Sequence, residues 1–140
     1  EQILHGAENA QAMQFINEKP GGLDFELTIK GANLSGGQKQ RVILSRALSG
    51  KPEILVLDDS SSALDYATDA KLRKVIRENY SGETTSVIVA QRISSIKHSD
   101  LILVIEDGRI TGSGCHDELM KSCELYKEIS ESQMGGALLE

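Results

Sequence analysis

Residues 54–65 read ILVLDDSSSALD: four apolar residues, two adjacent acids, a run of serines and a closing Ala-Leu-Asp. A continuous apolar run of this length predicts a strand buried on both faces of a sheet. Two carboxylates are costly to hold near a core unless a cation or a phosphate is bound beside them. Asp58 and Asp59 therefore mark a candidate functional site, although a single acid there would also suit a turn or a helix cap.

The bulk composition suits one globular domain. The chain has 140 residues, of which 39% are apolar and 26% are charged. Its net charge of -6 argues against nucleic acid as the main partner, because duplex binding requires a basic surface. Two cysteines without a CxxC spacing favour reduced thiols over a disulfide framework. The chain starts with Glu rather than Met and shows no signal-peptide pattern, so we expect it to derive from a longer polypeptide.

Hydrophobic periodicity predicts helices and strands that alternate along the chain. Strands joined by helices imply a parallel sheet with crossover connections, and chemistry in such sheets gathers at the carboxyl ends of the strands. Asp58, Asp59 and Gln91 fall at these ends. The expected helices are 1–19, 36–48, 93–98, 116–121 and 124–131, together with one that Asp65 or Thr68 caps and Ser81-Gly82 ends. The expected strands are 54–57, 86–90, 101–106 and 109–111, the last two forming a hairpin around Asp107-Gly108.

A second candidate site is the pentapeptide LSGGQ at the start of the helix 36–48. A Ser followed three residues later by Gln has the spacing of a capping box. Two glycines leave the first backbone N–H groups of the helix uncovered, so the positive end of the helix dipole can face an anion. An ordinary capped helix would explain the same pattern if it stood alone. The residues concerned are Leu34, Ser35, Gly36, Gly37 and Gln38.

Four stretches of the sequence together resemble the ATP-binding cassette (ABC) ATPases. NLSGGQKQRV (33–42) resembles the signature motif, and 54–65 resembles the Walker B strand and D-loop, usually ILxLDEPTSALD. SVIVAQRISSI (86–96) resembles the switch strand, usually VIxIAHRLST, and 101–119 resembles the hairpin and helix that follow it. The matches occur in the family's order. Their sequences are most similar to those of exporters, where this domain follows a membrane domain on one polypeptide.

The resemblance implies an α/β fold, a partial RecA-like parallel sheet of the P-loop NTPase type preceded by part of an α-helical subdomain. It places 1–50 in the helical subdomain, 51–134 in the C-terminal part of the ATPase core and 135–140 in a flexible tail. The Walker A motif G-x-x-x-x-G-K-[ST], the Q-loop and the adenine-stacking aromatic residue do not occur. We therefore expect the 140 residues alone neither to bind ATP tightly nor to hydrolyse it.

The resemblance also implies roles for the residues at the strand ends. Asp58 would be the Walker B acid that holds the Mg²⁺ of ATP. Asp59 stands where the family usually has the Glu that polarises the attacking water, and Gln91 stands where it usually has His. Asp is one methylene shorter than Glu, and Gln cannot carry a proton or a positive charge. Since a displacement near 1 Å can cost on the order of 10²-fold in rate, we expect weak hydrolysis at this site.

In the family, two cassettes pair head to tail, and each ATP lies between the Walker motifs of one and the LSGGQ of the other. The intact signature here would therefore serve a partner cassette, while Asp59 and Gln91 would weaken this chain's own site. This suggests the degenerate subunit of a heterodimeric multidrug-type exporter, on the cytoplasmic face of the cell membrane. The implied partners are a second, different nucleotide-binding domain and the membrane domain, with ATP and Mg²⁺ as ligands. The implied D-loop contacts with the partner are Ser62, Ala63, Leu64 and Asp65.

Several alternatives remain open at this point. Asp59 could be a plain loop or helix cap, or Asp59 and Gln91 could be tolerated variants in an active homodimer. A soluble ABC ATPase of DNA repair or translation would share the same motifs, although the acidic charge argues against it. A regulatory cassette that only binds nucleotide, or an inactive fragment of a larger protein, would also fit.

Overall fold

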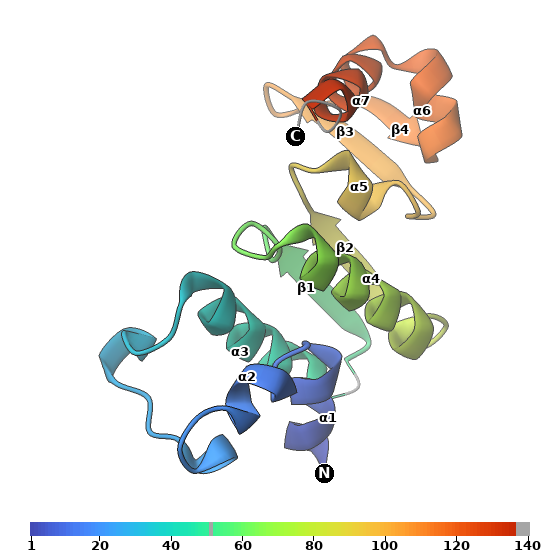
Figure 1. Ribbon diagram of the computed structural model, residues 1–140. Coiled ribbons are helices and arrows are strands. Elements are labelled where there is room, and N and C mark those ends of the chain that lie inside the picture. The colour runs from blue at the N-terminus through green and yellow to red at the C-terminus, as the bar shows by residue number, and fades with distance from the viewer. Residues whose placement is uncertain (51, 137–140) are drawn as a thin grey trace. The chain divides into compact units, whose positions relative to one another are not determined.

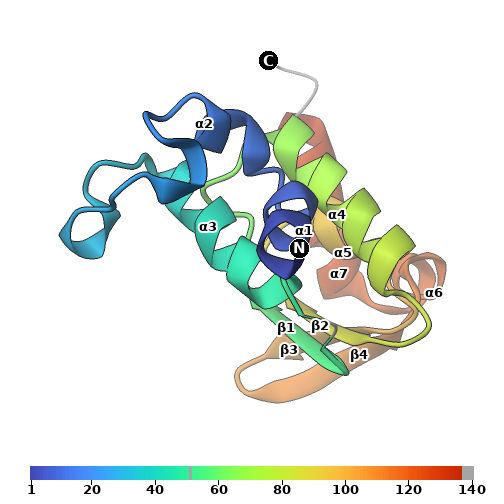
Figure 2. The same cartoon turned by 90° about the horizontal axis from the view of Figure 1, so that it is seen from below.

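The computed structural model describes residues 1–50 and 52–136 and divides the chain into two compact units, Glu1–Val89 and Ala90–Glu140 (Figures 1 and 2). We call these the N-terminal and the C-terminal unit. Across the described ranges, no helix combines the length and the apolar character that crossing a bilayer requires.

The N-terminal unit begins with helices and ends with a parallel strand pair. The predicted helix 1–19 is divided in two, because the backbone of Gln11 adopts a φ of 57° between the two helical segments. The predicted helix 36–48 and the following strand are confirmed. Its elements are α1 (Gln2–Asn9), α2 (Met13–Asn17), η1 (Gly22–Asp24), η2 (Ile29–Gly31), α3 (Gly36–Leu48), β1 (Ile54–Asp58), α4 (Tyr66–Tyr80) and β2 (Thr85–Val89).

Strands β1 and β2 form a parallel pair in which Asp58 lies opposite Val89. Leu55 and Leu57 point into the core that α3 and α4 share with the sheet. The other face of β1 carries Ile54 and Val56, which are 66% and 61% exposed. The prediction of a strand buried on both faces is therefore wrong for this structure, because the helices of the unit cover only one face of the pair.

Helix α1 packs closely along α3, as both views of the ribbon show (Figures 1 and 2). A Cβ added at Gly6 would clash with the carbonyl oxygen of Ser45 and lie 2.9 Å from the Cβ of Ser49. The far end of α3 is held by Tyr80 of α4, whose hydroxyl donates to the carbonyl of Leu48 at 2.6 Å. The absence of a side chain at Gly6 is thus what permits this helix pair to approach.

The C-terminal unit is a hairpin with three helices. Asp107 and Gly108 have φ values of 48° and 73°, as a two-residue type I′ turn requires, and the predicted hairpin is confirmed. Leu119 and Tyr126 are buried against β3. Helix α7 includes Gly135 and Gly136, and the rest of the predicted tail, 137–140, lies outside the described residues. The elements are α5 (Ile93–Ile96), β3 (Ile102–Glu106), β4 (Arg109–Gly114), α6 (His116–Ser122) and α7 (Glu124–Gly136).

Replacing Gly6 by Ala should destabilise the chain by about 1–3 kcal/mol, because the added methyl forces α1 and α3 apart. The free energy of unfolding in urea measures this effect. Gly50→Ala is the matched control, since a Cβ there meets no atom within 4 Å. Equal stability of the two variants would contradict the close packing of α1 on α3.

Candidate functional site

The first turn of α3 has the predicted capping box. The Ser35 hydroxyl accepts the Gln38 N–H at 3.3 Å, and the Ser35 N–H donates to the Gln38 side-chain oxygen at 3.0 Å. Leu34 is buried in the core beneath the turn, whereas Ser35 and Gly36 are exposed. The helix start therefore presents its glycine N–H groups on the surface, which is the arrangement that anion binding requires.

Asn33 fixes the loop that leads into this turn. Its side-chain oxygen accepts the N–H and the hydroxyl of Thr28, both at 3.2 Å, and its side-chain amide donates to the Glu26 carbonyl at 3.0 Å. The sequence interpretation gave Asn33 no role. Its signal was an Asn two residues before the N-cap of a helix, a residue type that often bonds to nearby backbone.

The carboxyl end of β1 carries the two acids at the surface. Asp58 and Asp59 are both exposed. The Asp59 N–H donates to the Val89 carbonyl at 3.0 Å, which extends the ladder by one residue beyond the strand. Asp59 then adopts a φ of 46°, a left-handed conformation that is uncommon outside glycine but more frequent for Asp. The chain turns away from the sheet at this residue, so its carboxylate is presented by a turn and not by the strand.

The structure brings the signature helix and the loop after β1 together. The side-chain amide of Gln40 donates to the Asp59 carbonyl at 2.9 Å, and its oxygen accepts the Ala63 N–H at 3.0 Å. A Cβ added at Gly37 would lie 2.9 Å from the Ala63 carbonyl oxygen. Sequence reasoning placed Gly37, Asp59 and Ala63 in separate motifs and missed Gln40, which joins them.

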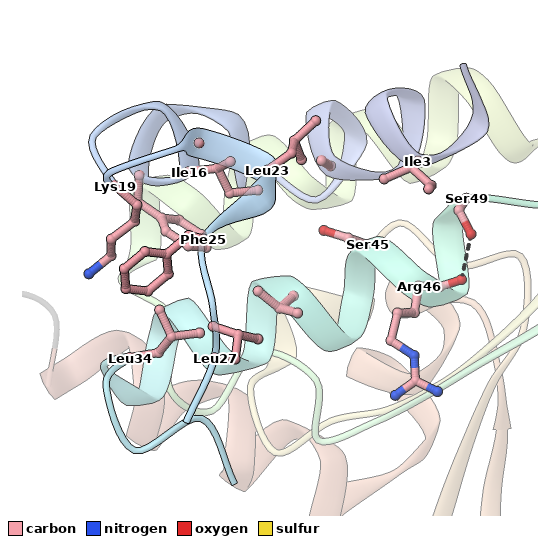
Figure 3. Close-up of a pocket in the computed structure, with 14 residues that line it drawn as sticks. Ile3, Ile16, Lys19, Leu23, Phe25, Leu27, Leu34, Ser45, Arg46 and Ser49 are labelled. Atoms are coloured by element: carbon pink, nitrogen blue, oxygen red, sulfur yellow. Dashed lines mark hydrogen bonds between the residues drawn. The ribbon is translucent and has the colours of Figure 1, made fainter. Parts of the chain in front are cut away.

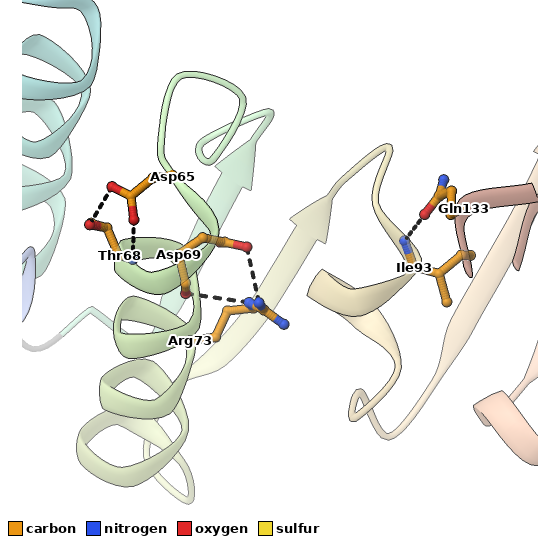
Figure 4. A network of polar contacts seen from close by, with 6 residues as sticks. All are labelled: Asp65, Thr68, Asp69, Arg73, Ile93 and Gln133. Carbon is orange, nitrogen blue, oxygen red and sulfur yellow. Dashed lines mark hydrogen bonds and ion pairs between the residues drawn. The ribbon is translucent and has the colours of Figure 1, made fainter. Parts of the chain in front are cut away.

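The loop ends at Asp65, which caps α4 and is one of the two cap residues that the sequence offered, the other being Thr68. One Asp65 carboxylate oxygen accepts the Thr68 N–H at 2.9 Å and the other accepts the Thr68 hydroxyl at 2.7 Å (Figure 4). These bonds, the hydroxyl first and then the N–H, lower the pKa of the Asp65 carboxyl. Leu64 is buried in the core, whereas Ser62 and Ala63 are exposed. Within α4, the buried Asp69 forms an ion pair with Arg73 at 3.1 Å.

Gln91 belongs to the C-terminal unit, whereas Asp58 and Asp59 belong to the N-terminal unit. Its side chain is exposed, and its backbone carbonyl accepts the Gln133 side-chain amide at 2.7 Å. The oxygen of the same Gln133 side chain accepts the Ile93 N–H at 2.9 Å (Figure 4). A glutamine from α7 thus fixes the backbone on both sides of Arg92, and the sequence interpretation did not find it.

A pocket of about 230 Å³ lies in the N-terminal unit between α1, the segment 22–27 and α3 (Figure 3). Phe15, Leu23 and Phe25 contribute to its apolar wall, and the charged side chains that line it are Lys19 and Arg46. Of the predicted site residues, Leu34 alone appears among those that line it. The pocket is therefore separate from the acids at the end of β1.

Comparison with known proteins finds similar chains among the ABC transporters. A family model for ABC transporters matches residues 3–62. The ABC transporter ATP-binding protein MG014 of Mycoplasma genitalium is 49% identical over 138 residues, which are 97% of this chain and 22% of that protein. The solved structure of a bacterial Atm1-family ABC exporter with ATP bound matches with a TM-score of 0.89 and 36% identity, over 94% of this chain and 23% of that one. Over nearly its whole length, the chain is thus similar to the ATP-binding part of ABC transporters.

A further ABC relative is a protein described as a multidrug resistance ABC transporter ATP-binding/permease protein, YheI of Bacillus subtilis. It is 44% identical over 145 residues, covering 95% of this chain and 25% of that protein. The chain thus spans about a quarter or less of the length of these ABC relatives. The predicted α/β fold is confirmed, because the helices and the small parallel sheet match the nucleotide-binding domain of an ABC exporter.

Magnesium fits the residues at the end of β1. In ATPase sites, Mg²⁺ is usually held by one or two carboxylates together with phosphate oxygens and water. Within the described part of the chain, no group of three or more His, Cys, Asp or Glu could hold a metal by itself. The exposed carboxylate of Asp58 suits the shared mode of binding, in which the nucleotide supplies the other ligands.

We expect a carbon-detected NMR titration to give Asp65 a pKa below its usual 3.8. Because the folded-state pKa is lowered, the stabilisation by this carboxylate is present above the unfolded pKa and is lost as the pH falls through the folded pKa. The stability difference between the wild type and Asp65→Ala should therefore shrink in acid. Thr68→Val removes the hydroxyl and should raise the pKa. A midpoint at or above 3.8 in the wild type would refute the cap.

Proposed function

We propose that this chain forms part of the nucleotide-binding domain of an ABC exporter, which couples ATP binding and hydrolysis to transport across a membrane. The observation that carries the proposal is the contact between the signature turn and the Asp58–Asp59 loop within one folded unit. The exporter match and the description of YheI as an ATP-binding/permease protein support a membrane transporter over the soluble ABC ATPases.

The chain's own residues would contribute to two ATP sites. Asp58 would hold Mg²⁺, which when bound offsets charge on the nucleotide phosphates. The exposed start of α3, with Leu34, Ser35, Gly36, Gly37 and Gln38, would offer N–H groups to an ATP held by a second nucleotide-binding domain. The D-loop, Ser62 to Asp65, would contact that same partner. Because the two contributions come from different residues, a substitution at Asp59 leaves the residues of the signature turn in place.

Hydrolysis at the site that contains Asp59 should be weak. The Asp59 N–H is bonded to Val89 and its carbonyl to Gln40, so its backbone has little freedom to move toward a substrate. A backbone held in this way cannot move forward to compensate for the Asp side chain, which is one methylene shorter than Glu. Gln91 can donate a hydrogen bond but cannot act as a proton-carrying or cationic group.

These features support a degenerate subunit that pairs with a different, active nucleotide-binding domain. The helical part, 1–50, and the core part, 51–134, would then lie on the cytoplasmic face of the cell membrane beside the membrane domain. The proposal includes no nucleic acid partner, in keeping with the net charge of -6. A homodimer with Asp59 and Gln91 in both sites is the competing arrangement.

The double substitution Asp59→Glu and Gln91→His should raise the ATPase turnover of the full-length complex by roughly tenfold or more, because it restores the longer acid and the basic group that the family usually has at these positions. Phosphate release by the purified transporter measures this effect. Asp117→Glu in α6 is the control, because it lengthens an exposed carboxylate that has no proposed role in hydrolysis. Unchanged turnover in an intact complex would show that Asp59 and Gln91 do not limit hydrolysis.

The 140-residue chain by itself should not bind Mg-ATP in the micromolar range, because it contains no Walker A motif to hold the phosphates. Isothermal titration calorimetry on the purified chain tests this directly, with the full-length transporter as the positive control. Micromolar binding by the isolated chain would overturn this part of the proposal.

A further inference from the structure

We propose that Gln40 is a positioning residue that ties the Asp59 loop to the signature helix and so couples the two ATP sites to which the chain contributes. The inference rests on the proposed function, since it assigns a new residue to the same site. Gln40 lies outside the pentapeptide LSGGQ and outside the acidic loop, and its role follows from the contacts of its side chain.

The Gln40 side chain uses both halves of its amide. Its nitrogen donates to the Asp59 carbonyl at 2.9 Å, and its oxygen accepts the Ala63 N–H at 3.0 Å. The two bonds hold both sides of the segment 60–62. Glu could accept from Ala63 but could not donate when ionised, and Met of similar length could do neither. An uncharged amide of this length therefore matches the two backbone groups.

A second contact on the same face of α3 supports this role. Gly37 lies three residues before Gln40, so both project toward one side of the helix. At Gly37 the Ala63 carbonyl oxygen would be 2.9 Å from an added Cβ, a distance that leaves no room for a side chain. The loop is thus pressed against the helix at Gly37 and hydrogen-bonded to it at Gln40.

The other side of α3 is anchored independently. The Arg41 guanidinium donates to the Gln11 carbonyl at 2.9 Å and lies over the Phe15 ring at 4.7 Å from its centroid. These contacts hold α3 to α2 and to the turn that precedes α2, whichever residue occupies position 40. Loss of the Gln40 amide would therefore release the loop without releasing the helix.

The Gln40 link would transmit movement between the two ATP sites to which the chain contributes. The start of α3 would face the ATP of the partner, while Asp59 would face the ATP of this chain's own site. A rigid link between the two means that a shift of the signature turn displaces the Asp59 backbone as well. Gln40 would not touch ATP, so its loss should change turnover more than nucleotide affinity.

The test compares Gln40→Met and Gln40→Glu with the wild type in the full-length transporter. Gln40→Met should lower kcat by roughly tenfold with KM changed by less than about threefold. Amide hydrogen exchange should become roughly fivefold faster at Ala63, since one hydrogen bond is lost. Gln40→Glu keeps the acceptor, so it should lower kcat while Ala63 exchanges nearly as in the wild type. Gln133→Met is the control for exchange, and should affect Ile93 but not Ala63.

The outcomes separate this inference from the proposed function. A wild-type transporter without ATPase activity would refute the proposed function, and the Ala63 exchange would still test the link. An active wild type with unchanged kcat in both Gln40 variants would overturn the positioning role alone. The positioning role would also be overturned if Gln40→Met changed kcat and thermal stability only as much as Gln133→Met does and amide exchange at Ala63 did not become faster.

Discussion

The close approach of the first turn of α3 to the loop after β1 is the constraint on which the candidate site depends. It requires a glycine at position 37, where the Ala63 carbonyl leaves no room for a Cβ, and an amide at position 40 that bonds to the loop at Asp59 and Ala63. The sheet supplies the other support through the bond from the Asp59 N–H to Val89. Two motifs that are about twenty residues apart in sequence thereby become one surface.

Under the proposed function, this arrangement would let one chain weaken one ATP site and support another. The departures from the family pattern, Asp59 and Gln91, are confined to side chains at the ends of strands. The signature turn keeps its capping box, its buried Leu34 and its two glycines. Replacing an acid or a histidine by a shorter or uncharged residue leaves this scaffold unchanged, because neither side chain forms part of the core. A catalytic defect can therefore accumulate without loss of the fold.

Much of the fold could be predicted from the sequence, because local signals agree with the structure where they are strong. The Ser35 and Gln38 spacing, the Asp65 cap and the Asp107-Gly108 turn each act within four residues. The break at Gln11 and the one-sided burial of Ile54 and Val56 could not be predicted, because both depend on which elements pack nearby. Gln40 and Gln133 were missed for the same reason: a glutamine that bonds to a distant backbone has no periodic signal.

The composition of the native complex tests the central claim most directly. Native mass spectrometry of the full-length transporter, purified from its own membrane, would show which nucleotide-binding subunits it contains. Our account predicts two different subunits, the second of which carries Glu and His at the positions that correspond to Asp59 and Gln91. A homodimer would place Asp and Gln in both sites. It would contradict the degenerate-subunit account and favour a slow or purely regulatory ATPase.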